Sequence, residues 1–352
     1  MSLRDRIKRM IEADGPMPVS LYMQLCLHDP QQGYYATRPG LGRDFITAPE
    51  ISQIFGELIG LWVVHEWQAI GRPSRFTLAE PGAGRATMMQ DALRAMSLTS
   101  DGRDCLSAIN LHLVEPSDHL RPMQAGRLAD YQPQFVSHID ALPHQPTIII
   151  SNEFLDCLPA RQFVRGEKGD WHERKVGLAD GELVMGVDRE AAVEPPSSLP
   201  ELDTMEYQPG LGTYALSIAA LVETDVPVRA LAIDYGLDGL PPDDSLRAFR
   251  NGEQIDPLAL PGESDLTVDV DFAELRRQGE AAGLHVHGTM AQGQFLLALG
   301  AEARMQQLVK ANPEKAAEIY DAAARLIDPA QLGVRFKAMC LSSEGLPTPA
   351  GF

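Results

Sequence analysis

Glycines and carboxylates between residues 80 and 115 have the types and spacing of a nucleoside-binding site. The segment Glu80-Pro81-Gly82-Ala83-Gly84 follows an apolar run and precedes a helix-length segment. Glycines let the backbone turn sharply and pass close to a ligand, and the helix that follows offers its first N–H groups. The turn has the pattern Glu-x-Gly-x-Gly, with Ala86 two residues after Gly84, and it lacks the third glycine of a Gly-x-Gly-x-x-Gly dinucleotide fingerprint. The turn therefore favours a nucleoside cofactor, with a nicotinamide dinucleotide as the weaker alternative.

Two further acids end the next apolar runs. Glu115 follows the second run, where a carboxylate can accept both hydroxyls of a ribose. The structural alternative is a strand-end carboxylate that stays in water. Asp140 follows the third run and could contact an adenine amino group.

A polar cluster, Ser151-Asn152-Glu153-Phe154-Leu155-Asp156, ends the fourth run. Acidic side chains there could hold a guanidinium by paired charged hydrogen bonds and orient it for reaction. We take Asn152, Glu153 and Asp156 as the candidate reaction residues. The alternatives are a solvated loop with an asparagine turn and, for Phe154, an ordinary core residue.

The elements that must position these residues form an alternating pattern. Helix-length segments separate the short apolar runs at 76–79, 111–114, 135–136, 147–151 and 228–234. This alternation predicts an α/β fold with a doubly wound, mostly parallel sheet, in which the strand ends meet at one edge.

The flanking segments have other patterns. Residues 1–70 predict a helical cap without a sheet, and residues 161–211 an inserted antiparallel β segment that ends in a linker at 194–200. The core then spans 71–160 and 212–300, and C-terminal helices span 301–352. Within these parts we expect residues 237–267 to form a long loop without secondary structure. Residues 284–287 and 294–299 should pair in a closing hairpin, and residues 301–340 should be helical.

Composition restricts the partners. Hydrophobic residues make up 44% of the 352 residues, which is typical of a folded globular protein. The net charge of −19 argues against nucleic acid as a partner, because binding to it depends on Lys and Arg. An acidic surface could attract a basic or arginine-bearing protein segment, although solubility alone also explains it.

The cysteines and the chain start indicate a compartment. Cys26, Cys105, Cys157 and Cys340 are far apart, which argues against disulfides and thiolate zinc sites. Reduced thiols, a start without a secretory pattern and the lack of a long apolar stretch predict a cytoplasmic protein without a membrane span. We expect no metal site, since His285 and His287 share a strand face but lack a third ligand with suitable spacing. Neither the oligomeric state nor the conformation of 237–267 follows from the sequence.

Several segments together resemble one protein family. They are GRDFITAPEIS at 42–52, EPGAGR at 80–85, NEFLDCLP at 152–159, DYG at 234–236, DLTVDVDF at 265–272 and QFL at 294–296. In order and spacing they are similar to the MidA-like family, the methyltransferases that include the mitochondrial complex I assembly factor. The resemblance covers nearly the whole chain, and its first and third segments are the most specific.

The resemblance implies a Rossmann-like methyltransferase fold with an N-terminal helical cap and S-adenosylmethionine as cofactor. It also implies symmetric dimethylation of an arginine on a core subunit of respiratory complex I, in support of its assembly. Carried over by position, the resemblance implies Glu80, Gly82 and Gly84 for cofactor binding, with Asp44 and Thr47 beside the cofactor, and Asn152, Glu153 and Asp156 for the reaction. The strand-end positions add Glu115 and Asp140 for the cofactor, and we expect Glu50, Phe154 and Tyr235 to contact the substrate.

The loop with Asp44, Thr47 and Glu50 would form a lid over the cofactor. Thr47-Ala48-Pro49-Glu50 also has the spacing of a helix N-terminal capping box, and both functions are compatible.

Some positions depart from the family pattern. Arg43 and Ala86 stand where glycine is usual, and Ala83 replaces a common proline. These departures leave a second hypothesis open, a non-catalytic assembly chaperone that retains the cofactor pocket. A nicotinamide oxidoreductase remains the third.

Overall fold

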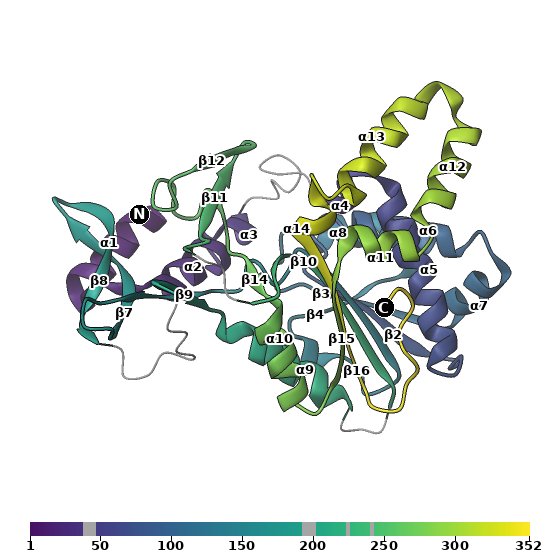
Figure 1. The fold of residues 1–352 in the computed structure, drawn as a ribbon, viewed down its shortest axis with the longest axis horizontal. Coiled ribbons are helices and arrows are strands. Elements are labelled where there is room, and N and C mark those ends of the chain that lie inside the picture. Colours follow the sequence, from purple (N-terminus) through teal and green to yellow (C-terminus); the bar gives the residue numbers. More distant parts are fainter. Residues whose placement is uncertain (38–46, 192–201, 223–225, 240–242) are drawn as a thin grey trace. The chain divides into compact units, whose positions relative to one another are not determined.

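The computed structural model describes residues 1–37, 47–191, 202–222, 226–239 and 243–352 (Figure 1). The chain divides into two compact units, between which it passes several times. Unit 1 consists of residues 1–45, 155–212 and 237–273, and unit 2 of residues 46–154, 213–236 and 274–352. Asp44, Arg43 and the expected linker at 194–200 lie outside the described residues.

A mostly parallel sheet forms the centre of unit 2, which confirms the predicted α/β methyltransferase fold. Its strand order is β15-β16-β10-β5-β2-β3-β4. Strands β4, β3, β2, β5 and β10 are parallel to one another, whereas β16 runs antiparallel to both β10 and β15. The bounds are β2 Phe76–Pro81, β3 Ile109–Val114, β4 Gln134–Val136, β5 Thr147–Asn152, β10 Val228–Leu237, β15 His285–Ala291 and β16 Phe336–Ser342.

Register places the ends of the parallel strands at one edge of this sheet. Pro81 at the end of β2 is opposite Val114 of β3, and Asn152 at the end of β5 is opposite Ile233 of β10. Every residue of β2 is buried, as expected for a strand between two helical layers. The side chains that follow these four strands are therefore brought to a common edge.

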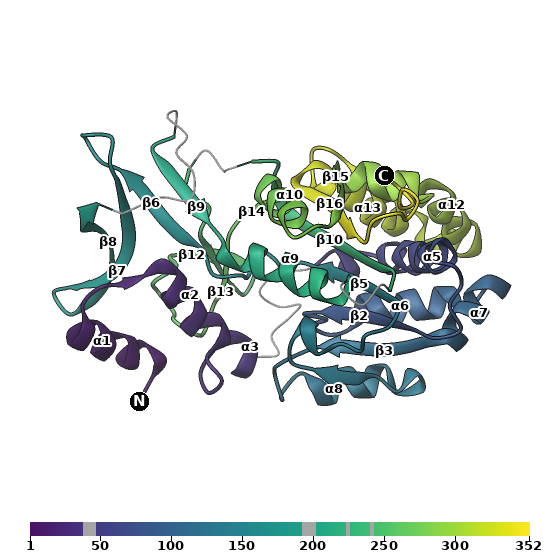
Figure 2. The same cartoon turned by 90° about the horizontal axis from the view of Figure 1, so that it is seen from below.

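Helices cover both faces of the sheet in unit 2 (Figures 1 and 2). Helices α5 (Gln53–Ala69) and α6 (Thr87–Met96) lie on one face, and α9 (Pro209–Val222) and α10 (Phe272–Ala281) on the other. Gly60 lets α5 approach α6 closely, because a Cβ atom there would be 2.5 Å from the carbonyl oxygen of Ala92. The helices α7 (Ser100–Ala108) and α8 (Arg121–Arg127) complete the βα connections.

Two sequence predictions at the antiparallel end of this sheet are wrong. The segment 294–299, expected to pair with 284–287 in a hairpin, belongs to helix α11 (Gln292–Ala298). The partner of β15 is instead β16, within a stretch that was expected to be helical. The helices of this stretch, which all precede β16, are α12 (Ala301–Ala311), the 3-10 helix η3 (Pro313–Lys315), α13 (Ala316–Ile327) and the short α14 (Leu332–Arg335). A strand buried along nearly its whole length has no period-two pattern, so it cannot be told from a buried helix by sequence.

Unit 1 combines helices with two antiparallel sheets. Its helices are α1 (Leu3–Asp14), α2 (Val19–His28) and α3 (Tyr34–Thr37). One sheet has the order β1-β7-β6-β9, with β8 paired to β7, and its bounds are β1 Met17–Pro18, β6 Arg161–Arg165, β7 Trp171–Ala179, β8 Glu182–Ala191 and β9 Thr204–Tyr207. The antiparallel character of 161–190 is thus confirmed.

Two further expectations fail in unit 1. The segment 1–70 is not free of strands, since Met17 and Pro18 pair with β7. Residues 237–267 are not a structureless loop, because β11 (Arg247–Arg250) pairs with both β12 (Glu253–Ile255) and β13 (Asp265–Thr267). Among the described residues, no helix is both long enough and apolar enough to cross a membrane.

Candidate active site

The glycine turn follows β2 at the common edge of the unit 2 sheet. Gly82 and Gly84 have φ angles of +65° and +51°, which favour glycine. A Cβ atom on Gly82 would lie 2.7 Å from Cδ2 of Phe154. The backbone can therefore lie this close to the Phe154 ring only because residue 82 has no side chain. Ala86, the N-cap residue directly before α6, has a φ of +56°, so this position has the left-handed backbone that glycine favours.

Glu80 is a buried carboxylic acid immediately before the turn. It is 4% exposed, and burial raises the pKa of its carboxyl well above the ordinary value. Its Oε2 atom has no hydrogen-bond partner among the described residues. A buried polar atom without a partner is costly, so this atom needs a partner that the described residues do not supply.

Glu115 lies directly after β3 and is tied to the glycine turn by Gln124. Its Oε1 atom accepts the N–H of Ser117 at 2.8 Å, and its Oε2 atom accepts the Gln124 amide at 3.0 Å. The same Gln124 amide donates to the carbonyl oxygen of Gly84 at 2.9 Å. Burial raises the pKa of the Glu115 carboxyl, although these donors oppose the shift. Gln124 therefore holds the second carboxylate and the turn together.

Asp140 follows β4 in the short helix η2 (Ile139–Ala141), and its side chain is exposed. In the sheet order β5-β2-β3-β4, the strand β4 that precedes Asp140 is three strands away from β5. Its contact with an adenine stays a prediction.

Glu153 stands directly after β5 in a strained backbone conformation. Its φ of +51° is unusual for a residue with a long side chain. Its N–H donates to the carbonyl oxygen of Ile233 at 3.0 Å, which fixes the backbone to β10. Its Oε1 atom accepts the backbone N–H of Ala48 at 3.0 Å and the Asn152 amide at 3.1 Å. Strain of this kind is concentrated at functional sites.

Asn152 supports Glu153 through the donor end of its amide. The acceptor end, Oδ1, is buried and has no hydrogen-bond partner among the described residues. The end of β5 therefore presents both an oriented carboxylate and an amide oxygen that lacks a donor.

Helix α4 (Ala48–Ile51) carries the part of the expected lid that the structure describes. Thr47 precedes α4 in extended conformation, but its side chain makes no capping hydrogen bond, so the expected capping box is absent. The expected proline is present in the first turn. Glu50 forms an ion pair of 3.2 Å with Arg85, which connects α4 to the residue after the glycine turn.

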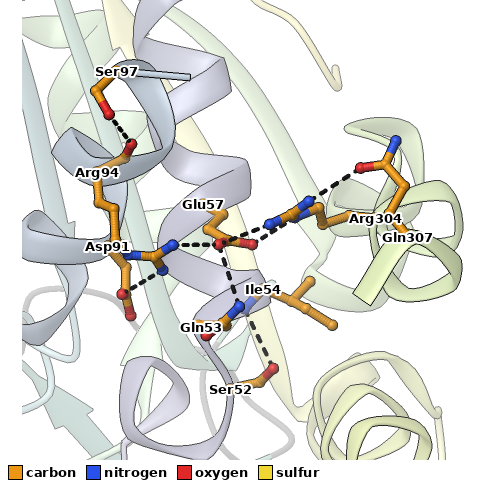
Figure 3. A network of polar contacts seen from close by, with 9 residues as sticks. All are labelled: Ser52, Gln53, Ile54, Glu57, Asp91, Arg94, Ser97, Arg304 and Gln307. Carbon is orange, nitrogen blue, oxygen red and sulfur yellow. Dashed lines mark hydrogen bonds and ion pairs between the residues drawn. The ribbon is translucent and has the colours of Figure 1, made fainter. Parts of the chain in front are cut away.

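The helix after α4 is anchored by a buried carboxylate (Figure 3). Ser52 begins α5 by accepting the N–H of Ile54, and one turn later Glu57 is almost fully buried. Arg304 of α12 donates to both carboxylate oxygens of Glu57, at 2.7 and 3.0 Å, and Arg94 of α6 binds it from the other side at 3.0 Å. Three helices of unit 2 are thus fixed to one side chain.

Phe154 and Tyr235 are held by Asp234, which the sequence analysis did not include among the site residues. The Asp234 carboxylate accepts the N–H groups of Phe154 and Tyr235 at 3.0 and 2.9 Å. The ring of Phe154 lies 6.1 Å from that of Tyr214 and over Gly82, whereas the ring of Tyr235 packs edge-on against Phe336. The Asp234-Tyr235-Gly236 motif was the available signal.

Asp156 lies in unit 1, whereas Asn152 and Glu153 lie in unit 2. Its carboxylate accepts the hydroxyl of Thr267 at 2.7 Å, and its carbonyl oxygen accepts the N–H of Val268. These contacts tie the segment after the cluster to β13. The structure therefore gives Asp156 a structural contact within its own unit, and a part in the reaction stays a prediction.

The described residues hold no cluster of three or more His, Cys, Asp or Glu side chains that could bind a metal ion. His285 and His287 have ring centroids 4.4 Å apart, and burial with the neighbouring charges of His285 and Arg229 lowers the pKa of His287 to about 4. That pair lies on the antiparallel strand β15, away from the carboxyl ends of β2 and β3 in the sheet order.

The residues at the sheet edge fit S-adenosylmethionine. The turn at Gly82 offers backbone without side chains, Glu115 offers a carboxylate for a ribose, and the unpaired Oε2 atom of Glu80 offers an acceptor for an ammonium group. The cofactor assignments of individual residues remain predictions, but they are the residues that the fold collects at one edge.

Comparisons with known proteins agree with this geometry. Residues 58–290 match a protein family described as "Putative S-adenosyl-L-methionine-dependent methyltransferase". The chain is 35% identical to the Drosophila melanogaster protein arginine methyltransferase NDUFAF7 homolog, mitochondrial, over 97% of this chain and 84% of the relative. It is 33% identical to the human protein arginine methyltransferase NDUFAF7, mitochondrial, over 94% of this chain and 81% of the relative.

A solved structure has the same fold. A COG1565 superfamily protein from Burkholderia thailandensis, bound to S-adenosyl-homocysteine, has a TM-score of 0.84 and 23% identity. The alignment covers 99% of this chain and 93% of that one. At this identity the likeness establishes the fold.

Proposed function

We propose that this chain, which belongs to the family of S-adenosylmethionine-dependent methyltransferases that includes the NDUFAF7 proteins, methylates an arginine side chain of a protein. The cofactor is S-adenosylmethionine, as for the family. The target that we propose is a core subunit of respiratory complex I, with symmetric dimethylarginine as product and complex I assembly as the process that it supports.

One observation carries the proposal for arginine: an oriented carboxylate ends the strand next to the glycine turn. Glu153 follows β5, the strand that pairs with β2, and its side chain is fixed by Ala48 and Asn152. A carboxylate binds a guanidinium through paired charged hydrogen bonds, which also set the direction of the guanidinium nitrogens. The side chain is therefore suited to present one nitrogen of an arginine to a methyl donor.

When bound, the cofactor supplies an electrophilic methyl group on a sulfonium, and its transfer to nitrogen releases S-adenosylhomocysteine and a proton. Glu80, Gly82, Gly84 and Glu115 would hold the cofactor at the carboxyl ends of β2 and β3. Most of the rate of such a displacement comes from holding donor and nucleophile close and in line. Glu153 would orient the nucleophile, and its negative charge would stabilise the arginine as it approaches a cationic donor.

Charge and similarity support a protein substrate. The net charge of −19 suits a basic, arginine-bearing segment better than a polyphosphate. The relatives that cover most of the chain carry the name protein arginine methyltransferase. At about one-third identity these names support the reaction class, and the complex I subunit rests on the family resemblance.

The alternative of a non-catalytic assembly chaperone rested on Arg43 and Ala86. Ala86 is buried and adopts the left-handed backbone that glycine would adopt, with its N–H bonded to the carbonyl oxygen of Ala83. The substitution therefore leaves the turn geometry intact, which favours catalysis. Arg43 lies outside the described residues.

The test is transfer of labelled methyl groups from S-adenosylmethionine to the purified complex I core subunit. We expect incorporation into arginine with the wild-type chain and at least a tenfold slower reaction with Glu153→Gln, whose amide has no negative charge and only one acceptor oxygen for the two guanidinium N–H groups. Cofactor binding by calorimetry provides the control, because Glu153→Gln should retain it. Incorporation into another residue type would refute the arginine assignment, and full complementation of an assembly defect by Glu153→Gln would favour the chaperone.

A further inference from the structure

A groove in unit 2 gathers apolar side chains that are exposed to solvent. It has a volume of about 550 Å³ and lies among α11, α12, α13 and α14. Three of its apolar side chains, Leu297, Tyr320 and Val334, are 41%, 46% and 47% exposed. Met305 and Ile327 line the hollow between them. Single exposed apolar residues are ordinary, but several around one concave surface are typical of a binding site.

Acidic side chains complete this groove. Glu302, Asp321 and Asp328 line it, and none of the described residues that line it is lysine or arginine. Glu302 and Asp321 are exposed and make no hydrogen bond or ion pair through their side chains within the described chain. Asp328 accepts the N–H of Ala330. The groove is thus apolar along its length and negative at its border, which complements a segment with apolar and basic residues.

The groove is built onto the same core as the candidate active site. Ala323 of α13 lines the groove and shares a hydrophobic core with Ala48 of α4, whose N–H holds the Glu153 carboxylate. Helix α13 packs on α4, and Arg304 fixes α12 to the buried Glu57 (Figure 3). A ligand in the groove would therefore be held by elements that are fixed relative to Glu153.

We propose that this groove binds a segment of the protein substrate in which apolar side chains stand next to arginine or lysine, and so positions the substrate at the candidate active site. The proposal rests on the proposed function, because it names the docking segment of that substrate. A second copy of this chain is a poorer occupant. In a two-fold dimer the same patch meets itself, so the acidic residues Glu302, Asp321 and Asp328 of one copy would face the acidic patch of the other.

The test uses the full chain and two fluorescein-labelled synthetic amphipathic peptides. One carries leucine on one helical face and arginine on the other, and the second has glutamate in place of each arginine. The groove variant is Glu302→Lys with Asp321→Lys. We expect this variant to raise the Kd for the leucine–arginine peptide by about tenfold or more, because two attractive charges become repulsive. A second variant, Tyr320→Ser, should weaken binding of the same peptide, because it removes an apolar contact.

Two control variants change an exposed side chain of unit 2 outside the groove. Glu318→Lys reverses a charge on α13 outside the groove, and Leu98→Ser removes a 63% exposed apolar side chain elsewhere in unit 2. Both should leave peptide affinity within about twofold. If Glu318→Lys weakens peptide binding as much as the groove variant does, the peptide is attracted only by the net negative charge of the protein. In that case the docking proposal fails.

Kinetics on the protein substrate separate this proposal from the proposed function. The groove variant should raise KM for the complex I subunit by about tenfold, with kcat and the Kd for S-adenosylmethionine unchanged. An unchanged KM, or a shift from dimer to monomer in ultracentrifugation, would overturn the docking proposal. If the wild-type chain methylates no complex I subunit, the proposed function fails, while the peptide measurements still decide whether the groove binds such segments.

Discussion

The backbone N–H of Ala48 donates to the Oε1 atom of Glu153 at 3.0 Å. The first residue of α4 thereby holds the carboxylate that follows β5, although the two are 105 residues apart in the sequence. Glu50, two residues after Ala48, pairs with Arg85 beyond the glycine turn. Helix α4 thus contacts both the proposed substrate side and the proposed cofactor side of the site.

Replacement of Glu153 by glutamine should separate substrate orientation from cofactor binding. The glutamine side chain can still accept the Ala48 N–H, but it lacks the charge that binds a guanidinium. Hydrogen bonds to charged groups contribute about 1.5–3 kcal/mol, so kcat/KM should fall about 10- to 100-fold. Calorimetry with S-adenosylmethionine should show an unchanged Kd. An unaltered kcat/KM would remove Glu153 from the reaction.

Replacement of Gly82 by alanine should weaken cofactor binding, and Gly71→Ala provides a matched control. Both glycines have positive φ angles, so each alanine costs about 1–2 kcal/mol of backbone strain. Only the Cβ atom at position 82 meets a neighbour, Phe154, since none lies within 4 Å at position 71. The Kd for S-adenosylmethionine should rise at least about tenfold for Gly82→Ala alone. Equal cofactor affinity of the two variants would contradict the assignment of the turn.

Glu80 should make stability depend on pH in the absence of cofactor. Its pKa in the folded protein lies above that in the unfolded chain, because burial disfavours the charged form. Its contribution is therefore fully present below the ordinary pKa and is lost as pH rises through the raised value. Glu80→Gln has no such loss. In urea unfolding at several pH values, the free energy of unfolding of the variant should therefore increase relative to that of the wild type from about pH 4 upward. A pH-independent difference would contradict the burial effect.

The same residue should make cofactor affinity depend on pH. An ionised Glu80 can pair with the ammonium group of S-adenosylmethionine, so the affinity of the wild type should rise over the window in which Glu80 ionises. The Glu80→Gln variant should bind more weakly and lack that increase. A parallel pH profile for both proteins in calorimetry would show that another group holds the ammonium.

The ion pair between Arg304 and Glu57 should stabilise the docking of α12. The Glu57 side chain is 2% exposed and that of Arg304 is 24% exposed, so solvent screens the pair only in part. Arg304→Gln should cost about 1–2 kcal/mol of unfolding free energy. The ion pair of Arg277 and Glu274 provides the control, because the Arg277 side chain is 61% exposed, and Arg277→Gln should cost less than about 0.5 kcal/mol. Hydrogen exchange should locate the loss in α12; equal losses in the two variants would contradict the anchoring.

Local patterns in the sequence identify the central half of the sheet and much of the site. The glycine turn, Glu115 and Glu153 each follow a short apolar run, and parallel strands bring such ends to one edge. That rule needs only the alternation of strands and helices, so the fold class follows from the sequence pattern. S-adenosylmethionine as cofactor came from the family resemblance, because the glycine turn by itself left a nicotinamide dinucleotide open. Residue-level roles remain predictions.

Pairing between distant segments accounts for most of what the sequence did not reveal. Strand β16 is inserted between β10 and β15, and the apolar run around Phe295 fits a buried helix as well as a strand. Gln124 lies on α8, and only the folded chain brings its amide to both Glu115 and Gly84. Asp156 follows Glu153 by three residues, yet the division into units falls between them.

Mass spectrometry of the complex I core subunit tests the central claim most directly. The subunit would be isolated from cells with the wild-type chain, without it, and with Glu153→Gln. We predict a dimethylated arginine in the subunit from cells with the wild-type chain. In cells without the chain or with Glu153→Gln, this modification should be absent or strongly reduced. An arginine methylated to the same extent in all three would contradict the account.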